Sequence, residues 1–146
     1  MYKSQIQSIL QLDSHSKRYF KGVFAIDELP RLLPMSGYVI NYDEHNKEGS
    51  HWVAVFANAK TVEYFDPNGQ QPLDKRLSDF IGPNYLFSPL ALQQILGNAC
   101  GFYCTYFILK RSRNCTANNI LSILTRINSD FIVKTYIYSH YKPFFV

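Results

Sequence analysis

Residues 93–110 read QQILGNACGFYCTYFILK, a polar loop followed by a long apolar segment. From Cys100 onward the segment is apolar on nearly all sides, which is the pattern of a buried helix. Gly97 and Asn98 break regular structure just before it. Lys110 stands near its end, where a cation complements the negative end of the helix dipole. The sequence therefore predicts a buried helix that begins at Cys100.

Cys100 falls at the first turn of this predicted helix. Free backbone N–H groups point outward at a helix N-terminus, and they lower the pKa of a thiol there. The position favours a reactive thiolate, although a free cysteine is more often an inert core residue. Cys104 lies one turn further into the same apolar helix, and we expect it to serve only in packing. Gly101 leaves room for another backbone to approach the thiol.

Strands are predicted in the middle of the chain and helices at both ends. The spacing and type of the apolar residues define these elements. The predicted helices are residues 3–12, 73–81, 116–127 and 129–140, and the predicted strands are residues 38–42, 51–57, 61–66 and 85–87. A short capped turn of helix is predicted at residues 27–30, stopped by Pro30 and Pro34. The order of elements and the chain length indicate one α+β domain over residues 1–146.

Residues 51–66 have the pattern of a β-hairpin, HWVAVFANAKTVEYFD. If its turn is residues 58–60, His51 lies opposite Pro67, and a loop one residue longer brings His51 opposite Asp66. Either register puts the histidine and the aspartate at one end of the hairpin, within cross-strand or diagonal reach. An acid beside an imidazole fixes its tautomer and stabilises its protonated form. On the sequence alone, a histidine and an aspartate that merely flank a hairpin end are an equal alternative.

The composition is that of a folded protein with a mild positive charge. Apolar residues make up 47% of the chain and charged residues 18%, so a packed core is expected and global disorder is not. The net charge of +4 permits weak, salt-sensitive contact with nucleic acid, but it is not the charge density of a dedicated nucleic-acid-binding protein. The basic cluster at residues 110–113 is better explained as charge at a helix C-terminus.

Cysteine and histidine usage limits the compartment and the metal chemistry. The chain has three cysteines and no signal-like N-terminal segment, which indicates reduced thiols in an intracellular protein. No apolar run approaches about 18 residues, so we expect no membrane span. The four histidines, His15, His45, His51 and His140, lack ligand spacing with one another or with the cysteines, and no metal site is expected.

Five blocks of sequence occur in an order that is typical of a protease family. They are FKGVFAIDELP at 20–30, YVIN at 38–41, GSHW at 49–52, EYFDPNG at 63–69, and a pair of glutamines followed by CGFYCTYF across 93–107. Together they resemble the adenovirus-type cysteine endopeptidases (adenains) and their relatives in viruses and virus-like DNA transposons. The chain is more distantly similar to the ubiquitin-like-specific (SUMO) proteases. The resemblance implies an α+β, papain-like cysteine protease fold in circularly permuted His-Asp-Gln-Cys order. Its central mixed β-sheet would be packed by helices, with the nucleophile at the N-terminus of a buried helix.

The resemblance also implies roles for individual residues. It makes Cys100 the nucleophile, His51 the general base and Asp66 the acid that orients the histidine. An oxyanion-binding glutamine is implied in the pair that precedes the cysteine. Adenain-like spacing selects Gln93 and SUMO-protease spacing selects Gln94, and the neighbouring CGFYC block favours Gln93.

Two further residues have expected roles beside the implied catalytic set. Trp52 follows the family's aromatic residue next to the histidine, where it is expected to support or shield the imidazole, to pack in the strand core, or both. Gly101 follows the implied nucleophile, and its lack of a side chain is expected to leave space for substrate.

The activity implied by the resemblance is endopeptidase cleavage of viral or element-encoded precursor proteins (capsid or core) at glycine-containing sites. We expect a monomer in the host nucleus or cytoplasm, with packaging in the virion also allowed. One alternative is a deubiquitinase or SUMO-type isopeptidase on the same fold, and another is a non-catalytic relative that binds proteins. The sequence requires no cofactor, and activation by DNA or a peptide stays open. The adenovirus enzyme is activated by a peptide disulfide-linked to a cysteine upstream of the nucleophile. No cysteine precedes Cys100, so covalent activation is not expected.

Overall fold

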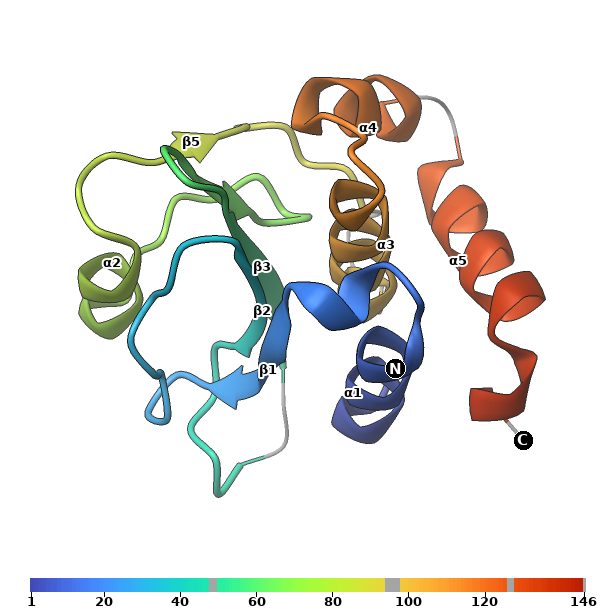
Figure 1. The fold of residues 1–146 in the computed structure, drawn as a ribbon, viewed down its shortest axis with the longest axis horizontal. Coiled ribbons are helices and arrows are strands. Elements are labelled where there is room, and N and C mark those ends of the chain that lie inside the picture. The colour runs from blue at the N-terminus through green and yellow to red at the C-terminus, as the bar shows by residue number, and fades with distance from the viewer. Residues whose placement is uncertain (48–49, 94–97, 126–127, 146) are drawn as a thin grey trace.

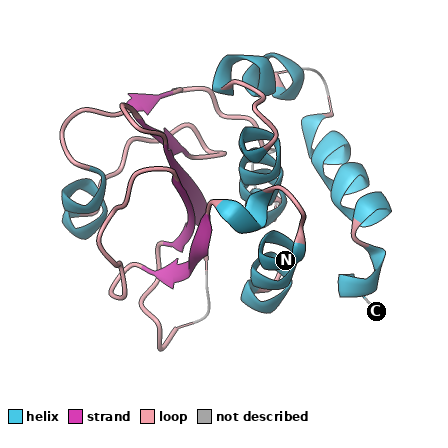
Figure 2. Ribbon diagram, in the orientation of Figure 1, coloured by secondary structure: helices cyan, strands magenta, loops and turns pink. Residues whose placement is uncertain are grey.

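The structure is a computed structural model of the chain that describes residues 1–47, 50–93, 98–125 and 128–145. It contains a five-stranded sheet with helices on both faces (Figures 1 and 2). The elements are α1 (Lys3–Leu12), η1 (Ser16–Arg18), β1 (Phe20–Ala25), β2 (Ser36–Asn41), β3 (Trp52–Ala57), β4 (Val62–Phe65), α2 (Lys75–Ile81), β5 (Leu86–Phe87), α3 (Cys100–Ser112), α4 (Ala117–Leu124), α5 (Ser129–His140) and η2 (Lys142–Phe145). The predicted long helices and strands are all present, with ends shifted by a few residues.

The sheet is mixed, as expected. Its strand order is β1-β2-β3-β4-β5, with parallel pairs at the two edges and antiparallel pairs in the middle. The sequence did not predict β1, because Lys21 and Gly22 interrupt its apolar pattern and its pairing with β2 shifts register between Phe20 and Gly22. The predicted helical turn at residues 27–30 is wrong. The chain instead makes a β-turn at residues 25–28, closed by a hydrogen bond from the Glu28 N–H to the Ala25 carbonyl.

Each face of the sheet carries its own apolar core. The smaller core lies under α2, and the larger one lies between the sheet and α1, α3 and α5, which Figure 1 shows on the opposite side of the strands. Both β2 and β3 are buried on both faces, so they read as continuous apolar runs rather than alternating ones. The predicted burial of α3 is confirmed, and the Phe65 and Phe107 rings stack 4.5 Å apart between β4 and α3.

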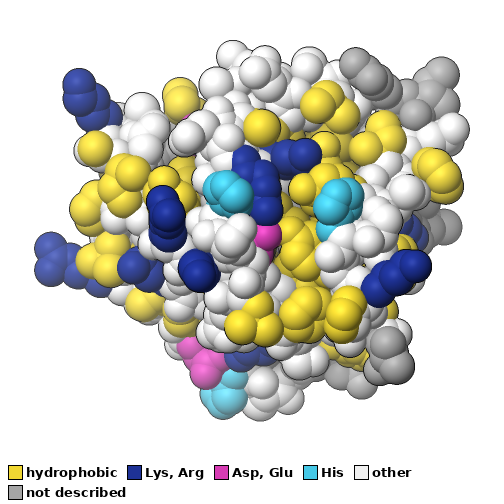
Figure 3. Space-filling model, turned by 45° about the vertical axis from the view of Figure 1, so that its right-hand side comes forward, with side chains coloured by type: hydrophobic (Ala, Val, Ile, Leu, Met, Phe, Trp, Pro, Cys, Tyr) yellow, Lys and Arg dark blue, Asp and Glu magenta, His cyan; other side chains and the backbone are white. Residues whose placement is uncertain are grey.

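The basic residues at the end of α3 make internal contacts. Arg111 forms a two-pronged ion pair with Glu63 at 2.7 and 3.1 Å, and Arg113 binds Asp13 at 2.6 Å. Lys110 lies over the Tyr136 ring. Figure 3 shows a face on which basic side chains are mixed with apolar ones. These contacts give the cations structural roles at a helix end. Within the described part of the chain, no helix is both long and apolar enough to cross a bilayer.

The β3–β4 hairpin has a different turn from the predicted one. Its loop is residues 58–61, and Ala57 pairs with Val62. The Asn58 side chain accepts hydrogen bonds from the N–H groups of Lys60 and Thr61, both at 2.8 Å. An asparagine that bonds to the following backbone lengthens and fixes a turn in this way. Neither predicted register is therefore correct, although the hairpin itself is.

A tight turn at residues 66–69 brings two distant segments together. Its Gly69 has φ +70°, and the backbone of residues 89–91 crosses directly over it. A Cβ on Gly69 would lie 2.6 Å from the Pro89 oxygen and 2.6 Å from the Leu90 carbonyl carbon. The absence of a side chain at Gly69 therefore lets the chain that leads into α3 lie against the end of β4.

Gly69→Ala is expected to destabilise the protein more than Gly82→Ala does. Gly82 also has a positive φ (+77°), but a Cβ there would meet nothing within 4 Å. Gly82→Ala should cost about 1–3 kcal/mol from backbone strain alone. Gly69→Ala should cost roughly 1–3 kcal/mol more, because backbone atoms must move. Urea denaturation followed by circular dichroism measures both, and equal losses would contradict the packing argument.

Candidate active site

Cys100 is the first residue of α3 and is nearly buried, with 8% of its surface exposed. The His51 ring and the backbone N–H groups of Trp52 and Gly101 lie near its sulfur and act to lower the pKa of the thiol. Two backbone donors and an imidazole around one sulfur favour the thiolate over the thiol.

His51 and Asp66 lie together at the end of the β3–β4 hairpin. His51 is the residue before β3 and Asp66 is the residue after β4. The His51 Nε2 and the Asp66 Oδ1 are 2.7 Å apart, and the aspartate side chain is only 2% exposed. Ala54 pairs with Phe65, so the contact runs diagonally across the hairpin. The predicted proximity is confirmed, although neither predicted register produces it.

The contact with Asp66 uses the Nε2 of His51 and leaves Nδ1 as the ring nitrogen for the Cys100 sulfur. Burial acts to lower the pKa of His51, but its hydrogen bonds to Asp66 and Cys100 outweigh burial and raise the pKa to about 9. Burial acts to raise the pKa of the Cys100 thiol, and the contacts with His51 and with the Trp52 and Gly101 N–H groups outweigh it, so this pKa is lowered. Both shifts favour the charged forms of the pair, thiolate and imidazolium, over the neutral forms.

Cys104 gives the contrast that the sequence predicts. It is fully buried one turn further along α3, and burial raises the pKa of its thiol well above the usual value. The charge of the neighbouring Cys100 thiolate raises this pKa further. Two cysteines on one helix therefore differ in reactivity because only the first has donors around its sulfur.

The turn at residues 66–69 connects the aspartate to the glutamine segment. The Asn68 N–H donates to the Asp66 Oδ1 at 2.8 Å, so the carboxylate is held by two partners. The Pro67 carbonyl oxygen accepts hydrogen bonds from the Leu92 and Gln93 N–H groups at 2.8 and 3.3 Å. The segment that carries Gln93 is thus attached to the turn that carries Asp66.

Gln93 lies on the Asp66 side of the site. Its Nε2 donates to the Asn68 side-chain oxygen. Its Oε1 is buried and has no hydrogen-bond partner among the described residues. Gln94, the alternative glutamine, lies outside the described residues. Gln93, one of the two predicted glutamines, therefore contacts Asn68, which lies two residues after Asp66 in the chain.

Trp52 and Gly101 pack against each other beside Cys100. A Cβ on Gly101 would lie 3.3 Å from the Trp52 ring and 3.0 Å from the Met1 Cβ. Trp52 is 9% exposed and belongs to the larger core, as the core-packing prediction expects. Its backbone N–H also faces the Cys100 sulfur. Glycine at 101 is required by this close approach.

The sequence did not point to several residues that support the site. The Tyr42 ring lies 5.7 Å from the His51 ring, and its hydroxyl bonds to the Tyr64 hydroxyl at 2.9 Å. The Tyr103 and Ser129 hydroxyls both donate to the Leu92 carbonyl, at 3.2 and 3.1 Å. In the sequence these residues appear only as polar groups inside apolar runs. That pattern does not identify their hydrogen-bond partners.

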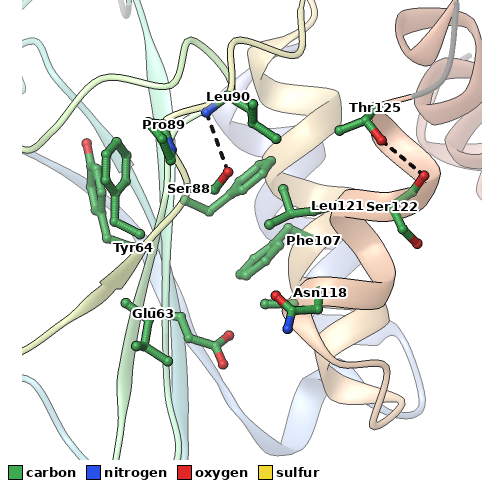
Figure 4. A pocket seen from close by; sticks show the side chains of 14 residues that line it. Glu63, Tyr64, Ser88, Pro89, Leu90, Phe107, Asn118, Leu121, Ser122 and Thr125 are labelled. Carbon is green, nitrogen blue, oxygen red and sulfur yellow. Dashed lines mark hydrogen bonds between the residues drawn. The ribbon is translucent and has the colours of Figure 1, made fainter.

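A separate apolar cavity of about 690 Å³ lies between β4, β5 and α4 (Figure 4). Phe107, Leu90 and Leu121 line it, and Asn118, Ser122 and Thr125 form its polar edge. None of the candidate catalytic residues lines it. In the ranges that the structure describes, no group of three or more His, Cys, Asp or Glu residues comes together as metal ligands.

Comparison with known proteins shows a fold similar to that of a protease. No protein-family model and no curated protein matches the chain. A similar solved structure is the crystal structure of the selenomethionine form of the ASFV pS273R protease, a viral protein, with a TM-score of 0.51 and 23% sequence identity. The match covers 68% of this chain and 41% of that chain. This chain thus spans well under half of that protease. At this identity the likeness shows a similar fold alone, and it does not single out the adenain type.

Iodoacetamide is expected to alkylate Cys100 much faster than Cys104 at pH 7. The lowered pKa of Cys100 keeps its thiolate populated at a pH at which an ordinary thiol is mostly protonated. His51→Ala should move the midpoint of Cys100 labelling to higher pH and slow labelling at pH 7 by about tenfold or more. Peptide mapping by mass spectrometry between pH 5 and 9 measures both rates. Equal labelling rates for Cys100 and Cys104 would contradict a lowered pKa at Cys100.

Proposed function

We propose that the protein is a cysteine endopeptidase with Cys100 as nucleophile, His51 as general base and Asp66 as the acid that orients the histidine. The observation that carries this proposal is that His51 has Asp66 and Cys100 as neighbours at the same time. The carboxylate binds one ring nitrogen, and the sulfur lies within reach of the other. The resemblance of the fold to a protease supports the same conclusion.

The reaction follows from the charges of this pair. The Cys100 thiolate attacks the carbonyl carbon of the scissile peptide bond, and its oxygen takes up the negative charge. The His51 imidazolium then gives its proton to the leaving nitrogen, and the C–N bond breaks to leave a thioester. His51, now neutral, takes a proton from a water molecule that attacks the thioester. The carboxylic acid product leaves, and the thiolate is restored.

The developing oxyanion needs hydrogen-bond donors. The Cys100 backbone N–H at the start of α3 is one, and we assign the other to the Gln93 side chain. Gln93 already lies on the segment attached to the Asp66 turn. Its Nε2 carries two N–H groups and the Asn68 oxygen takes one of them, so the second N–H is the donor assigned to the oxyanion.

The substrate class is proposed from the resemblance of the sequence blocks to viral proteases: cleavage of viral or element-encoded precursor proteins at glycine-containing sites. The space over Gly101 is taken up by Met1 and Trp52 of the protein itself, so it does not supply the room for substrate that the sequence led us to expect there. We place such a monomeric enzyme in the host cell nucleus or cytoplasm, or in the virion.

Cys100→Ala should abolish cleavage while the protein remains folded, and Cys104→Ala should keep it. Mass spectrometry of candidate capsid precursors after incubation with each variant detects the fragments. Cleavage by Cys100→Ala would overturn the assignment.

A panel of glycine-containing peptides and ubiquitin-like modifier conjugates separates two substrate classes. Efficient release only from the folded modifiers would make the protein an isopeptidase instead.

Gln93→Ala should lower kcat by about 10²–10³, whereas Gln94→Ala should have a much smaller effect. Loss of one oxyanion donor typically has this cost. KM should change little, because the interaction forms in the transition state. Steady-state kinetics on a cleaved peptide measures both variants. The reverse order of effects would move the role to Gln94.

A further inference from the structure

A second cavity, of about 770 Å³, begins at Trp52 and extends over the ends of β1 and β2. Met1 and Trp52 line it, and both also lie against Gly101, the residue after Cys100. The cavity therefore shares two lining residues with the packing around Gly101, the residue after the proposed nucleophile. It is distinct from the apolar cavity in Figure 4, whose lining residues come from the opposite edge of the sheet.

The floor of this cavity is a row of residues across three strands. Ala25 of β1 pairs with Asn41 of β2, and Asn41 pairs with Trp52 of β3. Residues opposite one another on neighbouring strands point to the same face of a sheet. Trp52 belongs to the core on the α3 side, so the Asn41 side chain faces the side on which Cys100 lies.

Asn41 has a buried donor without a partner. Its Oδ1 accepts the Asp43 N–H at 2.8 Å, which fixes the orientation of the amide. Its Nδ2 is buried and has no hydrogen-bond partner in the described ranges of the chain. Asn41 as a whole is 5% exposed and lines the cavity. Buried side-chain donors are nearly always satisfied, so an orphan donor at a cavity floor indicates a missing acceptor.

We propose that the Asn41 Nδ2 binds a backbone carbonyl of the substrate chain in this cavity. The proposal rests on the proposed peptidase function, since it names a contact of the same substrate. A side-chain amide nitrogen only donates, and a backbone carbonyl is the acceptor that every peptide offers regardless of sequence. Asn41 is thus a substrate-binding residue that contacts the main chain of the substrate.

The sheet geometry gives the position of the bound carbonyl. The Trp52 N–H reaches the Cys100 sulfur, and Asn41 lies one strand further on. Neighbouring strands are about 4.8 Å apart, so Asn41 is on the order of 10 Å from the thiol. An extended peptide rises about 3.3 Å per residue. The carbonyl therefore belongs to a residue two or three positions from the scissile bond.

Peptide binding to Cys100→Ala tests this contact without turnover. The probe is a fluorescein-labelled octapeptide with Gly-Gly at its centre, and fluorescence polarisation gives its Kd. Adding Asn41→Asp keeps the acceptor for the Asp43 N–H and replaces the donor with a carboxylate oxygen. We expect binding to weaken tenfold or more. The matched control is Asn118→Asp, the same substitution on α4 at the other cavity, and it should leave the Kd unchanged. Equal Kd values with and without Asn41→Asp, or no binding to Cys100→Ala, overturn the proposal.

A change in the peptide covers the case in which Asn41→Asp does not fold. Single carbonyl groups of the probe are replaced by methylene, one at a time, and each peptide is tested on Cys100→Ala. We expect about a tenfold loss at one carbonyl, two or three residues from the Gly-Gly bond, and no such loss at any position overturns the proposal. Cleavage of the probe by the wild-type protein without this loss would leave the peptidase function standing and remove the role of Asn41. Binding that depends on that carbonyl, without cleavage by the wild-type protein, would support the role of Asn41 and remove the peptidase function.

Discussion

The carbonyl oxygen of Pro67 accepts hydrogen bonds from Leu92 and Gln93, and this contact joins the two halves of the candidate site. On one side of it, Asp66 holds the imidazole of the hairpin. On the other side, the chain runs toward α3 and its first residue. Gly69 makes the contact possible, because any side chain there would occupy the position of the crossing backbone. The site therefore depends on a backbone-to-backbone contact more than on the catalytic side chains themselves.

The two cysteines of α3 show how strongly local donors decide thiol chemistry. Cys100 and Cys104 are both buried in the same core and lie one helical turn apart. Burial alone raises the pKa of a thiol, and it does so at Cys104. At Cys100 the imidazole and two backbone N–H groups reverse the effect. Burial then keeps water away from the ion pair, so the same environment that silences one thiol strengthens the charge contacts of the other.

The sequence predicted the elements and the pairing of the histidine with the aspartate, because these follow from short-range patterns. It did not predict the hairpin register, because the turn is lengthened on the β4 side, where the Asn58 side chain binds the Thr61 N–H and Ala57 pairs with Val62. It missed β1, whose parallel partner is found only through tertiary packing. The place of Gln93 was also beyond the sequence, since contacts with Pro67 and Asn68 set the path of its loop. Features set by short-range patterns could be predicted from the sequence, and features set by long-range contacts could not.

The thiol and its activating groups come from parts of the chain that fold by different routes. His51 and Asp66 meet through one local hairpin, whereas Cys100 reaches them only when α3 packs across the sheet. Before that step the thiol has its ordinary pKa, near 8.5, and is mostly protonated in a neutral cell. A growing chain therefore carries no reactive thiolate while it is being synthesised. Its thiol is less open to oxidation during synthesis, and under the proposed function cleavage of other chains begins only when the domain is complete.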